Sequence, residues 1–307
     1  MKANTASGTR SVVWLWIVAA LTATTIIVQS FGGNTTMAVV QFILGLIFVF
    51  WHGGRRYGAA NIITFFVTTE IVANGLENLS IATGFPFGNY HYTHSGMPFL
   101  FQVPITIGFA YFAYGYVAWC LASIILGKGD ERTTTVGGII IQPLTAAFIM
   151  VMWDVVMDPI SSTVGHQWIW EDGGGYNGVP LTNYLGWFLT VWIIFQVFAI
   201  VLHLRPKTVR SREAADFWVM PILMYGATAI SYLISYMLLQ THQTITDASG
   251  QTWTVTDIYQ SSTIMMLFTM LFATFLSSVT LLNSRAKKQS VSSATIANQQ
   301  QIDRLSV

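Results

Sequence analysis

Two carboxylates lie one helical turn apart inside an apolar stretch of the chain. The stretch runs from Met150 to Pro159 and contains Asp154 and Asp158. Residues four apart share one face of a helix, so both side chains would point the same way. An ionised Asp at the centre of a membrane helix costs roughly 2.5–3.5 kcal/mol on insertion scales. Such residues therefore face a cavity, a partner or a substrate, or stay protonated, and the structural alternative is a polar pair that holds helices together. Pro159 is expected to end the helix.

A second group of polar residues forms a stripe on an apolar segment at 59–79. Its members lie at offsets of zero, four, seven and eight residues and so share one helical face: Glu70, Asn74, Glu77 and Asn78. With a rise of 1.5 Å per residue, Glu70 lies about 17 Å and Glu77 about 27 Å from the inner end of the helix. Asp154 and Asp158 lie at about 24 and 30 Å by the same measure, in a hydrocarbon core about 30 Å thick. If the two helices pack together, four carboxylates line one outward-facing pocket, in which burial and like charge prevent all of them from ionising.

The composition indicates which class of protein must position these groups. The chain is 53% hydrophobic and only 9% charged, with a mean hydropathy of +0.56, whereas a soluble domain carries about 25% charged residues. Only helices and closed barrels span lipid, and the short alternating segments of a barrel are absent from the sequence. The expected fold is therefore an all-α polytopic membrane bundle. The single cysteine, Cys120, excludes an intramolecular disulfide and a cysteine-based zinc or iron–sulfur site within one chain.

Eight apolar segments are long enough, or nearly so, to cross a bilayer, near 12–31, 37–51, 59–79, 100–126, 138–158, 181–203, 217–240 and 258–282. Lys and Arg occur only at the amino terminus, after the second, fourth and sixth segments, and in the tail, and these positions account for all 14. The positive-inside rule then predicts eight transmembrane helices with both termini cytoplasmic. The first segment is long for a signal peptide and lacks a clear cleavage site, so a retained helix is expected.

The sequence predicts one membrane domain over 1–283. The tail at 284–307 is rich in Ser, Gln, Asn and Lys and is expected to be a disordered cytoplasmic segment. Alternating β-branched residues at 241–257 indicate a small hairpin.

The two longest outer connections combine Gly and Pro with aromatic residues, at 84–92 and 168–180. Such residues are typical of an aromatic belt at the membrane interface, but their density also fits a lid over a cavity. A metal site is a competing interpretation to the carboxylate site. His91, His94 and His166 lie in outer connections and could bind a metal together with a carboxylate. Six histidines divided between both faces cannot supply the larger set that membrane di-iron oxygenases need, so no metal is expected.

Several short motifs together resemble the carotenoid biosynthesis membrane-protein family. They are Glu70…Glu77, the run from Thr83 to Tyr92, Val103-Pro104, Trp153-Asp154…Asp158-Pro159, Trp168…Trp170, and Tyr176-Asn177-Gly178-Val179-Pro180…Asn183…Gly186-Trp187. The resemblance covers roughly residues 60–200. The family includes cofactor-independent hydratases of acyclic carotenoid ends, of the γ-carotene and bisanhydrobacterioruberin types. The resemblance therefore implies a hydro-lyase, without a cofactor, that adds water to a terminal isoprenoid double bond and gives a tertiary alcohol.

The residues agree with this implied chemistry. Hydration of such an alkene needs an acid that protonates carbon, aromatic faces that stabilise a carbocation, and a base that positions water. We expect Asp154 or Asp158 to donate the proton, with Glu70 or Glu77 assisting the water. Substrate and water are expected to contact Asn74, Asn78, Trp153, Tyr90, Tyr92, Trp168, Tyr176 and Asn183.

The expected partners are an apolar carotenoid entering from lipid, membrane lipids and other carotenoid biosynthesis enzymes, with no nucleic acid. The site is expected on the extracytoplasmic side of a multi-pass protein of the cell membrane. Two alternatives remain from the sequence. A proton-coupled transporter uses intramembrane carboxylates equally well, although the inverted repeats common in transporters are not visible. The second alternative is a lipid- or carotenoid-binding membrane protein without catalysis.

Overall fold

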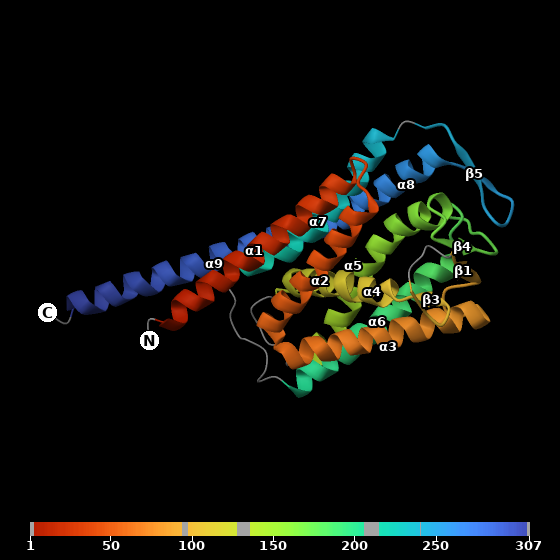
Figure 1. Ribbon diagram of the computed structural model, residues 1–307. Helices are drawn as coiled ribbons and strands as arrows, with labels where there is room; N and C mark the ends of the chain where they lie inside the picture. Colours follow the sequence, from red (N-terminus) through yellow and green to blue (C-terminus); the bar gives the residue numbers. More distant parts are fainter. Residues whose placement is uncertain (1–2, 94–97, 128–135, 206–214, 240, 306–307) are drawn as a thin grey trace.

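The computed structural model describes the chain except residues 1–2, 94–97, 128–135, 206–214, 240 and 306–307 (Figure 1). Its helices are α1 (Ala3–Gln29), α2 (Thr35–Tyr57), α3 (Ala59–Thr83), α4 (Thr106–Ile125), α5 (Val136–Pro159), the π-helical turn η1 (Ile160–Val164), α6 (Leu181–Leu204), α7 (Ala215–Leu238), α8 (Val255–Phe268) and α9 (Met270–Leu305). Its strands are β1 (Tyr90–Tyr92), β2 (Phe99–Leu100), β3 (Val103–Pro104), β4 (Trp168–Trp170), β5 (Thr244–Thr246) and β6 (Thr252–Thr254).

Within these described ranges, eight helical segments are long and apolar enough to span a membrane. They are Val12–Gln29, Thr35–Tyr57, Ala59–Thr83, Thr106–Ile125, Gly138–Val164, Leu181–Leu204, Ala215–Leu238 and Val255–Lys287. The predicted helical bundle with eight spans is thus confirmed, and the protein is a multi-pass membrane protein. The amino-terminal end of α1 and the carboxyl-terminal end of α9 lie at one end of the bundle, whereas the strands lie at the other (Figure 1).

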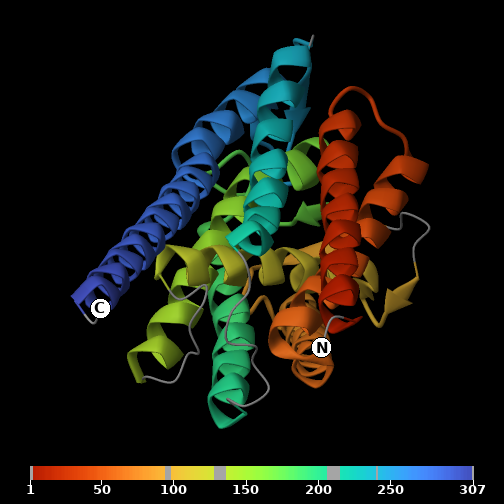
Figure 2. The same cartoon turned by 90° about the vertical axis from the view of Figure 1, so that its left-hand side faces the viewer.

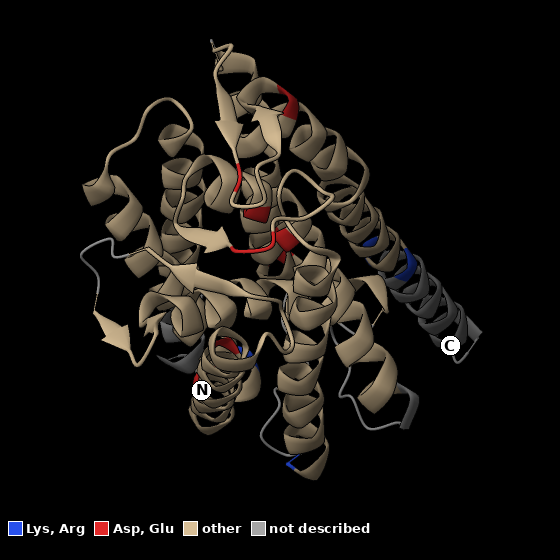
Figure 3. Ribbon diagram, turned by 90° about the vertical axis from the view of Figure 1, so that its right-hand side faces the viewer, with Lys and Arg blue, Asp and Glu red and all other residues tan. Residues whose placement is uncertain are grey.

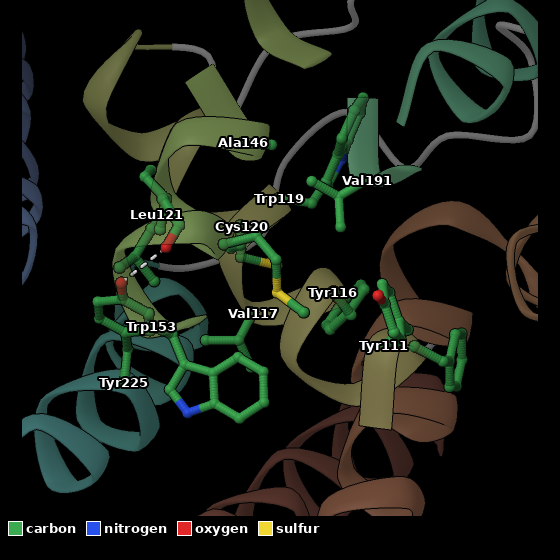
Figure 4. Packing of buried hydrophobic residues seen from close by; sticks show 14 of the residues in the cluster. Tyr111, Tyr116, Val117, Trp119, Cys120, Leu121, Ala146, Trp153, Val191 and Tyr225 are labelled. Atoms are coloured by element: carbon green, nitrogen blue, oxygen red, sulfur yellow. Dashed lines mark hydrogen bonds between the residues drawn. The ribbon is translucent and has the colours of Figure 1, made fainter. Parts of the chain in front are cut away.

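Helix α4 is the element around which the bundle packs. It contacts α2, α3, α5, α6, α7 and α9, and Figure 2 shows it crossing the bundle at a steep angle to α1 and α7. Small residues allow this close packing, because helices in membranes approach one another where side chains are short. A Cβ atom added at Gly115 would lie 3.4 Å from the Phe195 ring of α6. The larger side chains of α4, such as Tyr116 and Trp119, fill the core between the surrounding helices (Figure 4).

Two parts of the structure differ from the sequence-based expectation. Pro159 is the last residue of α5, as expected, but the chain does not leave the helical path there. It continues into the π-helical turn η1, whose wider register gives the Gly165 N–H to Ile160 O bond of 2.9 Å. A proline lacks the N–H that the α-helical register requires, which accounts for the change of register directly after it. The tail expected to be disordered from 284 is instead helical, since α9 reaches Leu305. This segment contains neither Gly nor Pro and is rich in the helix formers Ala, Gln, Lys and Arg.

The outer connections are short paired strands. β1 pairs antiparallel with β4, with Tyr90 opposite Trp170 and Tyr92 opposite Trp168. The side chains alternate, so that Tyr90 and Tyr92 are buried and His91 is exposed. The predicted hairpin at 241–257 is confirmed as β5–β6. The placement of one membrane domain over 1–283 stays a prediction.

Candidate active site

The two longest outer connections form one cover, here called the outer lid and defined as residues 84–93 and 165–172. Helix α3 ends at Thr83 because Gly84 adopts a left-handed conformation with φ of 79°. Ser80 of α3 then anchors the returning chain, since its Oγ accepts from the Phe87 N–H at 3.1 Å and donates to the Gly88 carbonyl at 3.0 Å. A further bond joins the two halves of the lid, from Asn89 Nδ2 to Asp172 Oδ2 at 2.7 Å. These contacts fix the lid over the ends of α3 and α5.

Three carboxylates gather beneath the outer lid: Glu77 of α3 and both Asp154 and Asp158 of α5. Their exposed fractions are 3%, 0% and 1%. Helices α3 and α5 each pack against α4 and α6, and this packing brings Glu77 of α3 near the two aspartates of α5. Figure 3, which views the molecule from the end that carries the strands, shows acidic residues in the outer connections and in the helices behind them. Glu77 and Asp158 line a cavity of about 50 Å³, called here the acid cavity. A volume of that size holds a few water molecules.

Glu77 accepts hydrogen bonds from three tyrosine hydroxyls. Tyr111 of α4 donates to Oε1 at 2.8 Å, Tyr92 donates to Oε2 at 3.0 Å, and Tyr90 donates to the same oxygen. Burial raises the pKa of the Tyr90 and Tyr92 hydroxyls well above the usual range for tyrosine, so that both stay protonated donors. The three hydroxyls replace the water that Glu77 loses on burial, and they hold its carboxylate in one orientation.

Asp158 is held by nitrogen donors instead. The indole N–H groups of Trp168 and Trp170 donate to Oδ1 at 3.1 and 3.2 Å, and the Asn183 amide donates to Oδ2 at 2.5 Å. The same amide lies 3.2 Å from Oδ2 of Asp154. The other oxygen of Asp154, Oδ1, is buried and has no hydrogen-bond partner among the described residues. One amide thus serves two carboxyl groups, an arrangement that suits a pair sharing a proton, because two buried like charges repel.

Aromatic rings form most of the cavity wall. Trp187 stacks on Tyr111 with ring centroids 4.1 Å apart, and Trp153 stacks on Tyr114 at 4.0 Å. Indole and phenol faces attract a positive charge by about 2 kcal/mol or more when water is excluded. The partly exposed lining residues include Ile107, Ala110 and Met157, so the opening of the cavity is apolar. The wall therefore suits an apolar molecule that becomes transiently cationic.

Four of the residues expected from the sequence lie elsewhere. Glu70 lies about 10 Å from Glu77, toward the start of α3. It is beside Gly108 of α4 and accepts a hydrogen bond from the Asn74 amide at 3.0 Å. Asn78 accepts from the Gln102 N–H at 3.0 Å, and the Tyr176 ring packs near Tyr184 at 6.0 Å. None of the four lines the acid cavity. The expected pocket of four carboxylates is therefore corrected to a cluster of three, because the polar stripe on α3 extends beyond the acid cavity and leaves Glu70 outside it.

The structure adds residues that the sequence interpretation did not select: Phe87, Tyr111, Trp170 and Trp187. Trp187 could have been found, because it lies four residues after Asn183 and so shares its helical face. Trp170 is two residues from Trp168 and points to the same side of a strand. Tyr111 had no such signal, since it lies in a uniformly apolar helix.

The histidines do not gather at this site. His91 pairs with Glu171 on the exposed side of the outer lid, and His166 lines a separate outer cavity. His94 lies outside the described residues. In the part of the chain that the structure describes, no group of three or more His, Cys, Asp and Glu residues could hold a metal ion.

The outer cavity has a volume of about 250 Å³ and lies between η1, β4 and the β5–β6 hairpin. Its lining includes the polar residues Ser162, Thr163 and Asp247. Trp168 and Trp170 line both this cavity and the acid cavity. These two indoles therefore form the partition between the outer cavity and the buried carboxyl groups.

Comparison with known proteins places this architecture in a family. Residues 37–246 match the family described as carotenoid biosynthesis protein. A stretch of 182 residues is 30% identical to the bisanhydrobacterioruberin hydratase of Haloarcula japonica, and it covers 58% of this chain and 58% of that protein. The match thus spans less than two thirds of the relative, and no solved structure matches the chain. The resemblance inferred from the short motifs is confirmed: the chain belongs to the carotenoid biosynthesis protein family.

Proposed function

We propose that this protein is a carotenoid hydratase that adds water to the terminal double bond of an acyclic (ψ) carotenoid end and gives a tertiary alcohol. The observation that carries the proposal is the meeting of Glu77, Asp154 and Asp158 around a small cavity with aromatic walls. Two groups are needed for hydration, a buried acid and a base near a water, and both are available there. The hydratase named among the relatives supports the same reaction class.

The reaction begins with proton transfer from the Asp154–Asp158 pair to the alkene. The π electrons of the double bond form the new C–H bond, which leaves a tertiary carbocation on the carbon that carries the two methyl groups. Asp158 is the member of the pair that lines the cavity, and the rings of Trp153 and Trp187 stand in the wall where they can stabilise the cation.

Water then completes the addition. Its oxygen attacks the cation, the new C–O bond forms, and the proton released from the water passes to Glu77. Return of that proton to the aspartate pair through cavity water restores the starting state, so the sum of the steps is the addition of one water and no cofactor takes part. Tyr90, Tyr92 and Tyr111 orient the Glu77 carboxylate for this role.

The two substrates would reach the cavity from different sides. The apolar opening formed by Ile107, Ala110 and Met157 suits a carotenoid entering laterally from lipid. The outer cavity lies behind the indoles of Trp168 and Trp170, and its polar residues Ser162, Thr163 and Asp247 suit the supply of water. With both termini cytoplasmic, the outer lid faces the extracytoplasmic side.

The orientation has its own test. A reporter inserted at 173–175 should be accessible only from outside sealed cells, and tags at either terminus only after the membrane is opened. An externally accessible tag at either end would reverse the proposed sidedness.

The reaction is tested with membranes that contain the protein and are given lycopene. The expected product is a tertiary alcohol heavier by one water, formed without oxygen gas and with a chelator present. In heavy water, deuterium should appear on the carbon next to the carbinol, and no label from isotopic oxygen gas should enter. Label from the gas or dependence on iron would make the protein an oxygenase. Proton flux in proteoliposomes without any conversion would favour a transporter.

A further inference from the structure

A second cavity lies between a different set of helices of the bundle and, unlike the acid cavity, has no carboxyl group among the described residues of its lining. It has a volume of about 150 Å³ and lies between α1, α2, α4 and α7. Most of its lining is apolar and includes Ile26, Phe42, Ala113, Val117 and Met224. We call it the apolar cavity.

Three hydroxyl groups in the lining of the apolar cavity already donate hydrogen bonds within the fold. Thr22 donates to the Val18 carbonyl at 2.8 Å, and Thr228 donates to the Met224 carbonyl at 3.0 Å. Tyr225 donates to the Ile149 carbonyl at 2.8 Å (Figure 4). The remaining polar atom of note is Gln41 Oε1, which is buried without a hydrogen-bond partner among the described residues. With most of its surface apolar, the cavity is suited to a ligand that is apolar over most of the length it occupies.

One face of α4 connects the two cavities. Ile107 and Ala110 line the acid cavity, whereas Ala113, Tyr114 and Val117 line the apolar cavity. These positions repeat every three or four residues and therefore form one stripe along the helix. The stripe is about 15 Å long at 1.5 Å per residue.

A stacked pair of rings contributes one ring to each cavity. Tyr114, in the lining of the apolar cavity, stacks on Trp153, in the lining of the acid cavity, with centroids 4.0 Å apart and planes 14° apart. Val117 and Tyr225, drawn with Trp153 in Figure 4, both line the apolar cavity. The Tyr114–Trp153 pair is thus a shared wall, and apolar surface continues on both of its sides.

We infer that the apolar cavity binds the polyene chain of the same molecule whose end lies in the acid cavity. This inference rests on the proposed function and narrows its substrate class to long, linear ψ-ended carotenoids. The continuity of the α4 stripe with the acid cavity favours this occupant over a separate lipid. Short terpenes that carry the same terminal alkene would occupy the acid cavity alone.

Gly45 of α2 offers a way to fill the apolar cavity without disturbing the fold. It lines the cavity, and a Cβ atom added there meets nothing within 4 Å. Gly45→Leu therefore projects a side chain into open space, and Leu is also the better helix former. Gly54→Leu is the matched control, because Gly54 lies in the same helix, also has open space, and does not line the cavity.

The variants are compared in proteoliposomes on two substrates with the same terminal alkene, lycopene and the short terpene β-farnesene. Gly45→Leu should lower kcat/KM for lycopene at least about tenfold, the scale on which small size differences act in an apolar pocket. Conversion of β-farnesene should be unchanged, and Gly54→Leu should leave both reactions unchanged. Equal loss on both substrates, or no loss on lycopene, would overturn the inference.

A binding measurement separates failure of this inference from failure of the proposed reaction. If the unaltered protein hydrates neither substrate, the proposed function fails. Binding of lycopene to the apolar cavity can still be tested, because lycopene retained by the purified protein is measured by its absorbance. Gly45→Leu should retain at least about tenfold less lycopene than Gly54→Leu. Equal retention of lycopene with loss of bound phospholipid from Gly45→Leu would assign the cavity to a lipid acyl chain and overturn the inference.

Discussion

The bundle buries two polar clusters, one at each end, and they are organised differently. The acid cluster consists of Glu77, Asp154 and Asp158, and the inner cluster consists of His52 and Arg56 with their aromatic neighbours. His52 is fully buried, and its ring nitrogens contact the Tyr116 hydroxyl at 2.5 Å and the Phe217 carbonyl at 3.0 Å.

The inner cluster is closed by rings. The His52 ring stacks on Phe217 with centroids 3.6 Å apart, and the Arg56 guanidinium lies 5.3 Å from the centroid of the Trp218 ring. The three cavities described above are lined by other residues. In the acid cluster, by contrast, like-charged groups face a space that can hold water. Burial of polar groups is thus common to structural and chemical sites, and convergence on a cavity is what separates them.

The largest expected effect comes from removing acidity in the acid cluster. Asp158→Asn and Glu77→Gln keep size and shape but cannot transfer a proton, so turnover of lycopene should fall by about 10²–10⁴-fold. The fold should survive, because the Asn183 amide can turn to present its oxygen to the amide introduced at position 158, and the tyrosine hydroxyls can accept from a glutamine.

The control for this change is Asp216→Asn, which removes an acid at an exposed ion pair with Arg285 and should leave turnover unchanged. Activity of both cluster variants near that of the unaltered protein, with normal thermal unfolding, would make the carboxyl groups structural.

A smaller loss of turnover is expected when the partition formed by Trp168 and Trp170 loses one indole. Trp168→Phe and Trp170→Phe each remove one of the two indole donors to Oδ1 of Asp158. A hydrogen bond to a charged group is worth about 1.5–3 kcal/mol, so each variant should lose about tenfold or more in kcat. Trp14→Phe, in an exposed position on α1, serves as the control. Unchanged kcat in both variants would show that the indoles only fill space.

A substitution in the inner cluster should lower the stability of the fold and leave turnover unchanged. His52→Phe leaves the Phe217 carbonyl and the Tyr116 hydroxyl without their shared partner, at a cost of about 1–3 kcal/mol in the free energy of unfolding. Turnover per folded molecule should be unchanged. Thermal unfolding in detergent measures the first quantity, with the exposed His242→Phe as control. A large loss of turnover without loss of stability would give the inner cluster a chemical role.

Glu70→Gln should have the smallest effect. From the sequence, either Glu70 or Glu77 was expected to assist the water, but the structure places Glu70 outside the acid cavity and beside Gly108. The pair of variants changes the same chemical group on the same helix and differs only in position. A loss as large as that of Glu77→Gln would bring Glu70 back into the mechanism.

The sequence was sufficient for the bundle and for part of the site. Hydropathy and the positions of Lys and Arg predicted the eight spans, because bilayer thickness and charge act on each segment separately. Asp154 and Asp158 were predicted to share a face, and both contact Asn183 in the structure. These features depend on local spacing.

The features that could not be predicted depend on contacts between distant segments. Tyr111 reaches Glu77 across 34 residues of chain, and β1 meets β4 through pairing that no local pattern specifies. The misplacement of Glu70 has the same origin, since the stripe on α3 is continuous in sequence, but of its two carboxylates only Glu77 reaches the acid cavity. Helix packing decides which part of a polar stripe becomes a site.

The amide that Asn183 shares between two acids also bears on how the protein is made. Because the helices of the chain enter the bilayer in order from its amino terminus, α5 is inserted with Asp154 and Asp158 before α6 brings Asn183 beside them. During that interval the two acids lie in lipid without the amide that later serves both, and the neutral forms are the less costly ones. Nascent chains stalled before α6 should therefore be the least stable intermediates of biosynthesis and the preferred substrates of membrane quality-control proteases.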